Sequence, residues 1–357
     1  MRNAPTTLAV PLPTSDPALT AVADRIWARS AAVDAAAAFP TQDIADLADS
    51  HWLAAAHDIR GAASLPWLAA VGAASLTVGR LFEGHLNAVQ LAARGSHAAS
   101  VILRAETCTG RISGVWNAEG DGGLKAVRVP GGYSVSGRKI HCSGAGAIRR
   151  PVVTAKVDDD WLMLLPDTAD PGVSVDLSVW QASGMRGTAT GTVTFDKVVV
   201  ADAAVIGAPG DYYRSPWFSG GAWRVLAVQL GGLNRIMELH AGRLRDDPVA
   251  RARFATAAGA HEAARLMVSE AARRAETPGG ESEAIDAYVD LARGSFESLA
   301  LTIVEMTRRN AGLSSFIAPD PLDRCLRDLE TYLRQPFLDI SRDHATRWLA
   351  VHGGRFT

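Results

Sequence analysis

The chain has 357 residues, a net charge of −2 and an isoelectric point near 6.5. This length allows two or three domains and a large buried core. The near-neutral charge, without a stripe of Arg and Lys with interleaved aromatic residues, argues against nucleic-acid binding, and no apolar run reaches the ~18 residues that a membrane span needs.

The three cysteines, Cys108, Cys142 and Cys325, are odd in number, far apart and form no C-x-x-C pair. This pattern argues against a disulfide framework or a zinc site and favours a reducing compartment, so we expect a cytoplasmic protein. The nine histidines show no metal-ligand spacing, so no metal is expected. The first residues lack the pattern of a signal peptide.

The first hundred residues have helical periodicity. Apolar residues near 3.6-residue spacing predict helices over 18–38, 41–52, 65–81 and 83–94, the third with Pro66 in its first turn. We therefore expect a helical domain over residues 1–103, in which nothing looks catalytic.

The pattern then changes to period 2. Alternating runs predict strands over 112–116, 125–129, 133–142, 151–157, 161–166, 173–176 and 190–200, separated by turns rich in Gly, Pro and Asp. Short strands at this regular spacing indicate a β-sandwich or barrel over residues 104–206.

Long helical patterns return after an aromatic-rich loop over 207–221. The loop residues Tyr212, Tyr213, Trp217 and Phe218 either fill a seam between domains or line a substrate pocket, and the sequence supports both interpretations equally. Helices are predicted over 223–245, 248–274, 283–310 and from 321 onward, which favours a four-helix bundle over residues 207–357.

Two sequence motifs in this chain of helical, β and helical regions resemble those of a known family. Residues 115–119 read VWNAE and residues 137–144 read GRKIHCSG; residues 184–190 read GMRGTAT and run into VTFDKVVV at 193–200. In their order and spacing these blocks resemble the flavin-contacting motifs of the acyl-CoA dehydrogenase superfamily. The resemblance implies an α+β multidomain protein with an N-terminal helical domain, a middle β-domain and a C-terminal four-helix bundle.

The resemblance also implies a flavin, FAD or alternatively FMN, held by two strand ends. It assigns Val115, Asn117 and Ala118 to one end, and His141, Cys142 and Ser143 to the other, with the Ser143 hydroxyl near the flavin N5. The hydride chemistry of such a site belongs to the cofactor.

Three further residues have open roles. His141 stands where relatives carry a bulky aromatic residue, so it is either a proton donor or, as we favour, a flat packing surface. Arg186 and Arg243 are candidates for an anionic group. Arg243 lies near the family's arginine for the neighbouring subunit's FAD pyrophosphate, but its R-x-x-F-G context is missing, which favours a surface arginine.

The chain departs from the family at the catalytic base. Dehydrogenases of this family remove a substrate α-proton with a glutamate, placed either after an R-D-A element or on the first helix of the bundle. Here Arg327-Asp328-Leu329 matches R-D-A, yet the expected position holds Gln335-Pro336, and no Glu lies near residues 223–224. The catalytic residues are therefore unknown. Asp328 or Asp339 would supply the carboxylate base only if the last helices had a different register from the expected one.

Three hypotheses follow. The first is an FAD-dependent oxidoreductase of the acyl-CoA dehydrogenase type, acting on an acyl thioester or a related small molecule. The alternative is a flavin-dependent monooxygenase or oxidase on the same fold, which needs no α-proton base; the third is a non-catalytic flavin-binding subunit. The expected partners are a small-molecule substrate, an electron-transfer flavoprotein or flavin reductase, and further copies of the chain in a homodimer or homotetramer.

Overall fold

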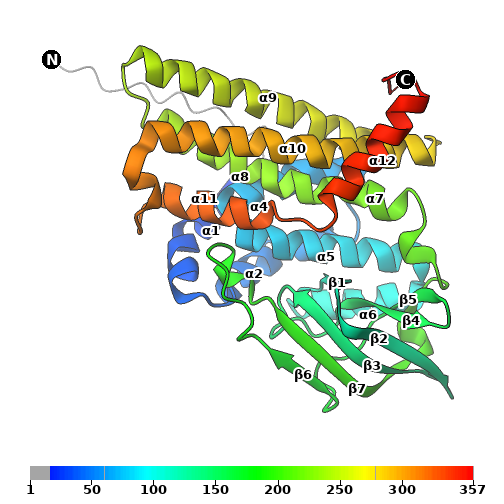
Figure 1. The fold of residues 1–357 in the computed structure, drawn as a ribbon. Helices are drawn as coiled ribbons and strands as arrows, with labels where there is room; N and C mark the ends of the chain where they lie inside the picture. Colours follow the sequence, from blue (N-terminus) through cyan, green and yellow to red (C-terminus); the bar gives the residue numbers. More distant parts are fainter. Residues whose placement is uncertain (1–16, 60, 278, 357) are drawn as a thin grey trace.

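The computed structural model describes residues 17–356 except 60 and 278. Residues 1–16, which the sequence places in the first domain, lie outside the described part. The helices form two layers above a curled β-sheet (Figure 1). The predicted order of helices, then strands, then helices is confirmed.

The N-terminal helices are α1 (Pro17–Ala36), α2 (Thr41–Asp49), α3 (Trp52–Ala55), α4 (Leu65–Ala74), α5 (Leu76–Gly95) and α6 (His97–Cys108), with a short 3₁₀ helix, η1 (Gly61–Ser64). The break predicted at residue 82 was wrong, because α5 runs continuously through Phe82. The helix breaks instead at Ser75, which has an extended backbone and whose side chain accepts a hydrogen bond from Val78 N.

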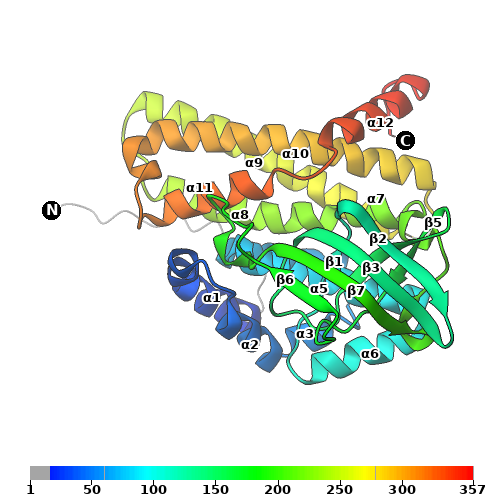
Figure 2. The same ribbon diagram turned by 60° about the horizontal axis from the view of Figure 1, so that its bottom comes forward.

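The strands are β1 (Val115–Trp116), β2 (Glu119–Val129), β3 (Gly132–Cys142), β4 (Val152–Val157), β5 (Asp160–Leu164), β6 (Val173–Asp176), β7 (Gly191–Ala201) and β8 (Val205–Ile206). They form one mixed sheet in the order β6-β7-β3-β2-β4-β5-β8, and β1 pairs in parallel with β4. Figure 2 shows this sheet curling below the helices. The prediction started β2 at Lys125, six residues after its actual start at Glu119, and missed β8, a two-residue edge strand.

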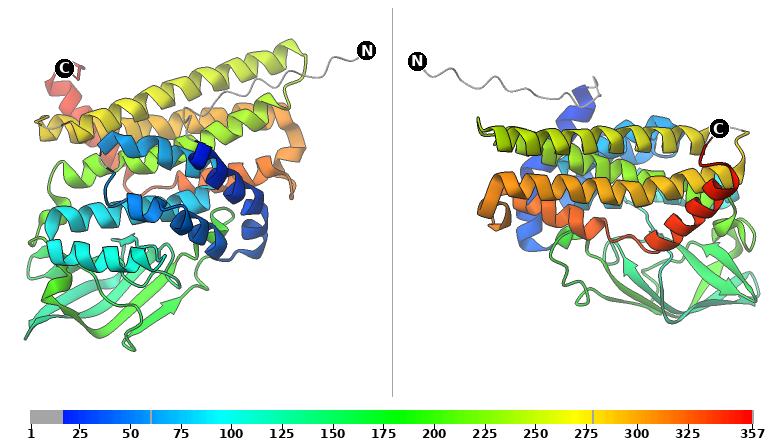
Figure 3. Two further views of the ribbon diagram at one scale, coloured as in Figure 1. Left: turned by 180° about the vertical axis from the view of Figure 1, so that it is seen from behind. Right: turned by 45° about the horizontal axis from the view of Figure 1, so that its top comes forward.

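The C-terminal helices are α7 (Trp217–Gly221), α8 (Trp223–Ala241), α9 (Pro248–Glu276), α10 (Ser282–Ala311), α11 (Pro321–Tyr332) and α12 (Leu338–Val351). The 3₁₀ helices η2 (Arg186–Thr188), η3 (Asp202–Ala204), η4 (Asp211–Tyr213) and η5 (Gly312–Phe316) lie in the connections. Figure 3 shows α9 and α10 side by side in the outer layer, with α12 crossing them near the C-terminus.

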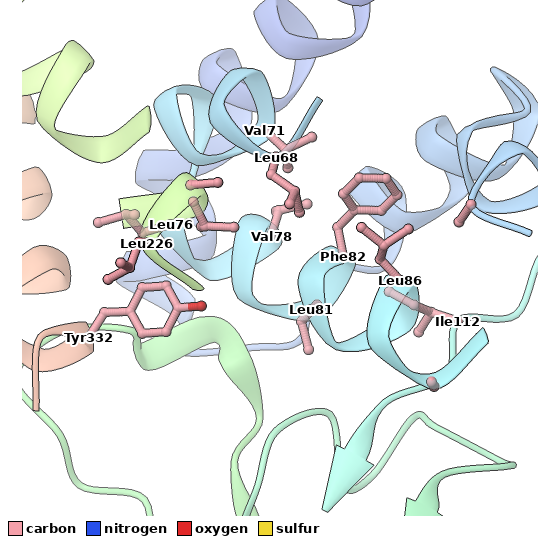
Figure 4. Packing of buried hydrophobic residues seen from close by; sticks show 14 of the residues in the cluster. Leu68, Val71, Leu76, Val78, Leu81, Phe82, Leu86, Ile112, Leu226 and Tyr332 are labelled. Atoms are coloured by element: carbon pink, nitrogen blue, oxygen red, sulfur yellow. The ribbon is translucent and has the colours of Figure 1, made fainter. Parts of the chain in front are cut away.

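The inner layer joins the two helical regions. Helix α4 packs along α8 so closely that side chains are excluded: a Cβ atom at Gly72 would lie 2.1 Å from Val228 O, and one at Gly231 would lie 2.1 Å from Ala69 O. Figure 4 shows the apolar core between these helices and α5, with Leu226 and Tyr332 beside Leu76 and Val78. The helices therefore present one rigid wall, α5, to the sheet. In the described residues no helix has the length and apolar character of a membrane span.

Candidate functional site

The ends of β1 and β3 lie side by side, as the motifs predict. Trp116 Nε1 donates to Ser143 O at 3.0 Å, and Ile140 N donates to Ala118 O at 3.1 Å. These two bonds bring Val115, Asn117 and Ala118 next to His141, Cys142 and Ser143. The six residues that the resemblance assigns to a flavin thus lie together where β1 and β3 end, a region termed the strand-end edge.

A β-bulge shapes this edge at His141. The pairing of β3 with β7 shifts between Lys139 and Cys142, and His141 has a positive φ of 54°. A non-glycine residue in this region is uncommon and is typical of functional sites. The bulge leaves His141 exposed and Cys142 buried. Burial raises the pKa of the Cys142 thiol to about 12, so it stays protonated and is not a nucleophile.

Beneath the edge, Lys139 is fully buried and orders the loop between β1 and β2. Its ammonium donates to Asn117 O at 3.1 Å and to Thr154 Oγ1 at 2.9 Å, and it forms an ion pair with Glu119. Burial lowers the pKa of Lys139, and the Glu119 carboxylate opposes that shift. Thr154 Oγ1 in turn donates to Asn117 Oδ1 at 2.7 Å. The Asn117 oxygens are thereby occupied, and its amide N–H groups remain as donors.

The second motif lies directly beside Ser143. Gly144 N donates to Thr188 O at 2.8 Å, and Thr190 Oγ1 lies 3.4 Å from Ser143 Oγ and 2.8 Å from Thr188 Oγ1. In this long contact Ser143 Oγ is the acceptor. The half-buried Ser143 hydroxyl therefore keeps its own proton available for donation. Both motif blocks therefore meet at this hydroxyl.

Helix α5 faces the strand ends. A Cβ atom at Gly84 would lie 3.6 Å from Gly114 Cα, and one at Gly144 would lie 3.3 Å from the Leu81 side chain. His85 links α5 to two other segments. Its Nδ1 accepts from Ser113 N, just before β1, at 3.1 Å, and its Nε2 lies 3.0 Å from Leu53 O in α3. Burial lowers the pKa of His85 to about 4, so the ring is neutral and donates from Nε2.

The aromatic loop closes one side of the site. Tyr213 donates its hydroxyl hydrogen to Asn117 Oδ1 at 3.1 Å, and its ring contacts Tyr212, Phe218 and Trp161 at centroid distances of 5.0, 5.1 and 6.4 Å. The loop therefore packs as an aromatic cluster beside Asn117, and a role in a substrate pocket stays a prediction.

The arginine candidates lie elsewhere. Arg243 makes a bidentate ion pair with Asp320, at 3.0 and 2.6 Å, at the far end of α8 from this loop. It is thus already paired within the chain. Arg186 is half-buried at the start of η2, the 3₁₀ helix that ends at Thr188.

The expected position of the base holds no carboxylate. Gln335 Nε2 donates to Tyr332 O at 2.7 Å, and Gln335 lines a small cavity of about 50 Å³ between α8, α10 and the 333–338 segment. Asp328 is buried and accepts from Met185 N at 2.6 Å, while Asp339 is exposed and pairs with Arg342 at 2.9 Å. Each of these three side chains is therefore engaged by a partner within the chain.

Sequence reasoning missed a set of polar residues in the helical wall. Glu297 lines the small cavity, but it is paired with Arg334 and Arg342, each at 2.8 Å. Charged and amide side chains also lie buried or half-buried along α5 and α8: Arg80, Glu83, Asn87, Gln90 and Arg224. The sequence could have indicated these residues, because they stand inside otherwise apolar helical runs, where an unpaired charge is costly.

A larger hollow lies away from the strand ends. It measures about 580 Å³ and is lined by residues of α5, η1 and α9, among them Gln90, Arg94 and Arg273. In the described part of the chain, no three His, Cys, Asp or Glu side chains gather as a metal site would require.

Comparison with known proteins agrees with this architecture. Residues 221–336 match the family described as acyl-CoA dehydrogenase, C-terminal domain. No curated protein shows a significant sequence match to the chain.

Solved structures match over nearly the whole chain. FMN-bound TdsC from Paenibacillus sp. A11-2, a dibenzothiophene monooxygenase, has a TM-score of 0.83 at 19% identity over 95% of this chain and 97% of its own. KijD3 in complex with FMN and dTDP-3-amino-2,3,6-trideoxy-4-keto-3-methyl-D-glucose has a TM-score of 0.82 at 20% identity, over 96% and 95%. The 3-HSA hydroxylase from Rhodococcus sp. RHA1 has a TM-score of 0.79 at 18% identity, over 95% and 97%. The chain thus has the fold of these flavoproteins, and its residues 221–336 match the C-terminal domain of acyl-CoA dehydrogenases.

Proposed function

We propose that the chain is a flavin-dependent monooxygenase. The observation that carries this proposal is the position of the expected base, where the Gln335 amide is bound to Tyr332 O in place of a carboxylate. A neutral amide does not accept an α-proton near pH 7, so acyl-CoA dehydrogenation lacks a group that it requires. Oxygen transfer has no such requirement, and the similar structures of a monooxygenase and a hydroxylase support it.

The strand-end edge fits a planar flavin ring. It offers the Ser143 hydroxyl, the Asn117 amide N–H groups and exposed backbone at Ala118, and the His141 bulge keeps that residue's side chain outside the core. These groups would hold the ring by hydrogen bonds and by contact along one face. A bound reduced flavin supplies the two electrons with which molecular oxygen is divided between a hydroxylated product and water.

FMN fits this chain better than FAD. The arginine that the resemblance relates to the FAD pyrophosphate, Arg243, has both its terminal nitrogens on Asp320. TdsC and KijD3 are both described with FMN. Since each turnover consumes two electrons, we expect a flavin reductase rather than an electron-transfer flavoprotein as the partner.

The chain's own residues control access and polarity. Tyr213 and its aromatic neighbours cover the Asn117 end, and the α5 wall closes the opposite side. This enclosure would exclude water from the reacting atoms. Lys139 would fix the loop at Asn117 through its bond to the backbone carbonyl.

The test compares two ways of using the flavin. The purified protein, with its flavin identified by mass, is mixed anaerobically with butyryl-, octanoyl- and branched-chain acyl-CoAs. The same protein is then supplied with NADH, a flavin reductase and oxygen in the presence of indole. We expect no flavin reduction by the thioesters and an oxygenated indole product. Rapid bleaching by a thioester would favour a dehydrogenase, and a protein that takes up no flavin would exclude both reactions.

Gln335→Glu and Pro336→Glu sharpen the test. Removal of a general base from an enzyme that relies on it costs about 10²–10⁴ in rate. Flavin reduction by a thioester that appears only in a Glu variant would therefore identify position 335 or 336 as a vacant base position. Self-association remains a prediction, and light scattering of the flavin-loaded protein measures it.

A further inference from the structure

The larger hollow lies where three elements meet. Its volume of about 580 Å³ is within the range of small-molecule sites. The end of α5, the short helix η1 and the last turns of α9 form its walls. A Cβ atom at Gly61 of η1 would lie 3.2 Å from Cβ of Glu276, so the backbone of η1 packs directly on α9. The hollow therefore has a closely packed frame.

A buried amide lines this hollow without a partner. Gln90 is 6% exposed, and its Nε2 makes no hydrogen bond in the described part of the chain. A buried polar group in this state is destabilising unless a ligand or water binds it. The last torsion of a glutamine side chain is broad, so the amide can turn its N–H groups toward the hollow.

The last turn of α5 adds a free positive charge. Arg94 is exposed, lines the hollow, and makes no ion pair or side-chain hydrogen bond with the described residues. Its guanidinium carbon lies 6.0 Å from the centroid of the Trp217 ring. The carboxylate that lines the hollow, Glu276, is already paired with Arg224 at 2.5 Å. All five N–H donors of Arg94 are thus available to a ligand.

The end of α9 leaves a second positive charge uncompensated. Glu270 accepts from Arg273 Nε and Nη2 at 2.6 and 2.7 Å and from Arg274 Nε at 2.7 Å, so one carboxylate serves two guanidinium groups. The bond from Arg273 and that from Arg274 lower the pKa of Glu270 to about 2, so it is ionised near pH 7. Arg273 lines the hollow and keeps its Nη1 without a partner among the described residues.

We propose that this hollow binds a phosphate group, either free or carried by a small organic molecule. A phosphate group carries about −1.5 to −2 charges at pH 7 and offers three strong acceptor oxygens. This matches the two uncompensated positive charges and the donors of Arg94, Arg273 and Gln90. A carboxylate would compensate one charge and leave the other. The inference goes beyond the proposed function and does not rest on it, because the hollow is lined by other residues than the strand-end edge.

The experiment measures binding to the whole chain. Isothermal titration calorimetry at one fixed ionic strength, before and after loading with FMN, compares inorganic phosphate, ribose 5-phosphate, ribose and acetate. We expect both phosphates to bind at least tenfold more tightly than acetate, and ribose not to bind. Tighter binding of ribose 5-phosphate than of inorganic phosphate identifies an ester as the ligand, and equal or weaker binding identifies the free anion. Phosphate binding that is lost once FMN is bound would assign the hollow to the cofactor and overturn the inference.

Arg273→Gln has a matched control on the same helix. Arg265 donates to Glu262, three residues earlier, at 2.7 and 2.6 Å, as Arg273 does to Glu270, but it does not line the hollow. It lies about 12 Å away along α9 at 1.5 Å per residue. Arg94→Gln and Arg273→Gln should each weaken phosphate binding about tenfold, as expected for a lost hydrogen bond to a charged group. Arg265→Gln should leave the affinity unchanged.

Gln90→Leu guards against misfolding of the arginine variants. It removes an amide without a partner and keeps a similar volume, so the melting temperature should stay unchanged or rise while phosphate binding weakens several-fold. Three results would overturn the inference: no phosphate binding, equal affinities for acetate and phosphate, or equal losses in Arg273→Gln and Arg265→Gln.

Discussion

Two polar clusters border the candidate site, and they differ in how they are built. The cluster under the sheet edge, centred on Lys139, comes from residues 117–154 and satisfies its members with backbone and side-chain bonds. The helical wall combines α5 with residues from α8, α9 and α11, and it leaves polar atoms without partners in the described part of the chain, among them Tyr332 Oη and Arg224 Nε. The first cluster is a complete support, whereas the second has hydrogen-bonding capacity left for a ligand.

The difference follows from what each cluster does. A support that orders backbone near a cofactor must be fully bonded, because a partly satisfied buried network is costly and loose. A recognition surface must keep donors free until its ligand arrives, and it pays for that in stability. Substitutions in the first cluster should therefore destabilise the protein, and substitutions in the second should change binding.

Lys139→Met gives the largest expected effect. The change leaves the Glu119 carboxylate and the Asn117 carbonyl without their buried partner, and removal of one member of a buried ion pair costs about 3–5 kcal/mol. We expect the free energy of unfolding in urea to fall by about 4 kcal/mol, with loss of flavin retention. Lys156→Met, at an exposed position on strand β4, is the control. An equal effect of both changes would contradict the assigned role.

His85 should make the contact between α5 and the sheet sensitive to acid. Its folded pKa of about 4 lies below the ordinary 6.5, because the ring is buried. Between pH 6.5 and 4 the unfolded chain takes up a proton that the folded chain does not, so stability is lost as the pH falls. At about 1.4 kcal/mol per pKa unit, the loss approaches 3 kcal/mol. Urea unfolding of the wild type and of His85→Gln at pH 7.5 and 4.5 measures it, and parallel pH profiles would exclude His85 as the cause.

Asp328 should respond to pH in the opposite direction. Burial raises its pKa from 3.8 to about 6. Between these values the folded state binds the extra proton, so the contribution is complete below pH 4 and is lost as the pH rises to about 6. The change is about 2–3 kcal/mol. Asp328→Asn keeps an acceptor for Met185 N, so the variant should be the more stable protein at pH 7 and lack this pH dependence. A variant that is less stable than the wild type at pH 7 would show that the ionised carboxylate is stabilising.

Much of the sheet edge was predictable from the sequence, because period-2 patterns and Gly-rich turns are local signals. The strand over 133–142 follows from them, whereas the meeting of residues 115–118 with 141–143 was implied by the family resemblance. The bulge at His141 was not predictable, because it depends on the register of β3 against β7. The first six residues of β2 were missed because Gly120, Gly122 and Gly123 conceal its alternation.

The helical wall was much less predictable. The break at Ser75 lies within an apolar run, since α4 and α5 are both buried there and periodicity alone gives no boundary. The partner of Arg224 is Glu276 on α9, 52 residues away, and Tyr332 reaches α5 from the end of α11. Such contacts arise from tertiary packing and leave no local pattern. The two boundaries between the three predicted domains and the flavin contacts stay predictions.

Ser143→Ala should have the smallest effect on stability and is the finest test of the contrast. The Ser143 hydroxyl receives a 3.4 Å bond from Thr190 and is only half-buried, so its loss should change the free energy of unfolding by less than about 0.5 kcal/mol. If it donates to a bound flavin, the same change should shift the flavin absorbance and raise the flavin dissociation constant about tenfold, as expected for one lost hydrogen bond near the upper end of the usual range. Thr190→Val removes the hydroxyl that donates to Ser143 but leaves the Ser143 hydroxyl in place, and it serves as the control. Ser143 thus lies at the end of a strand, but, like the unpaired polar groups of the helical wall, it keeps a hydrogen-bond donor for a ligand. Unchanged flavin affinity and absorbance in Ser143→Ala would make it an ordinary turn residue after β3.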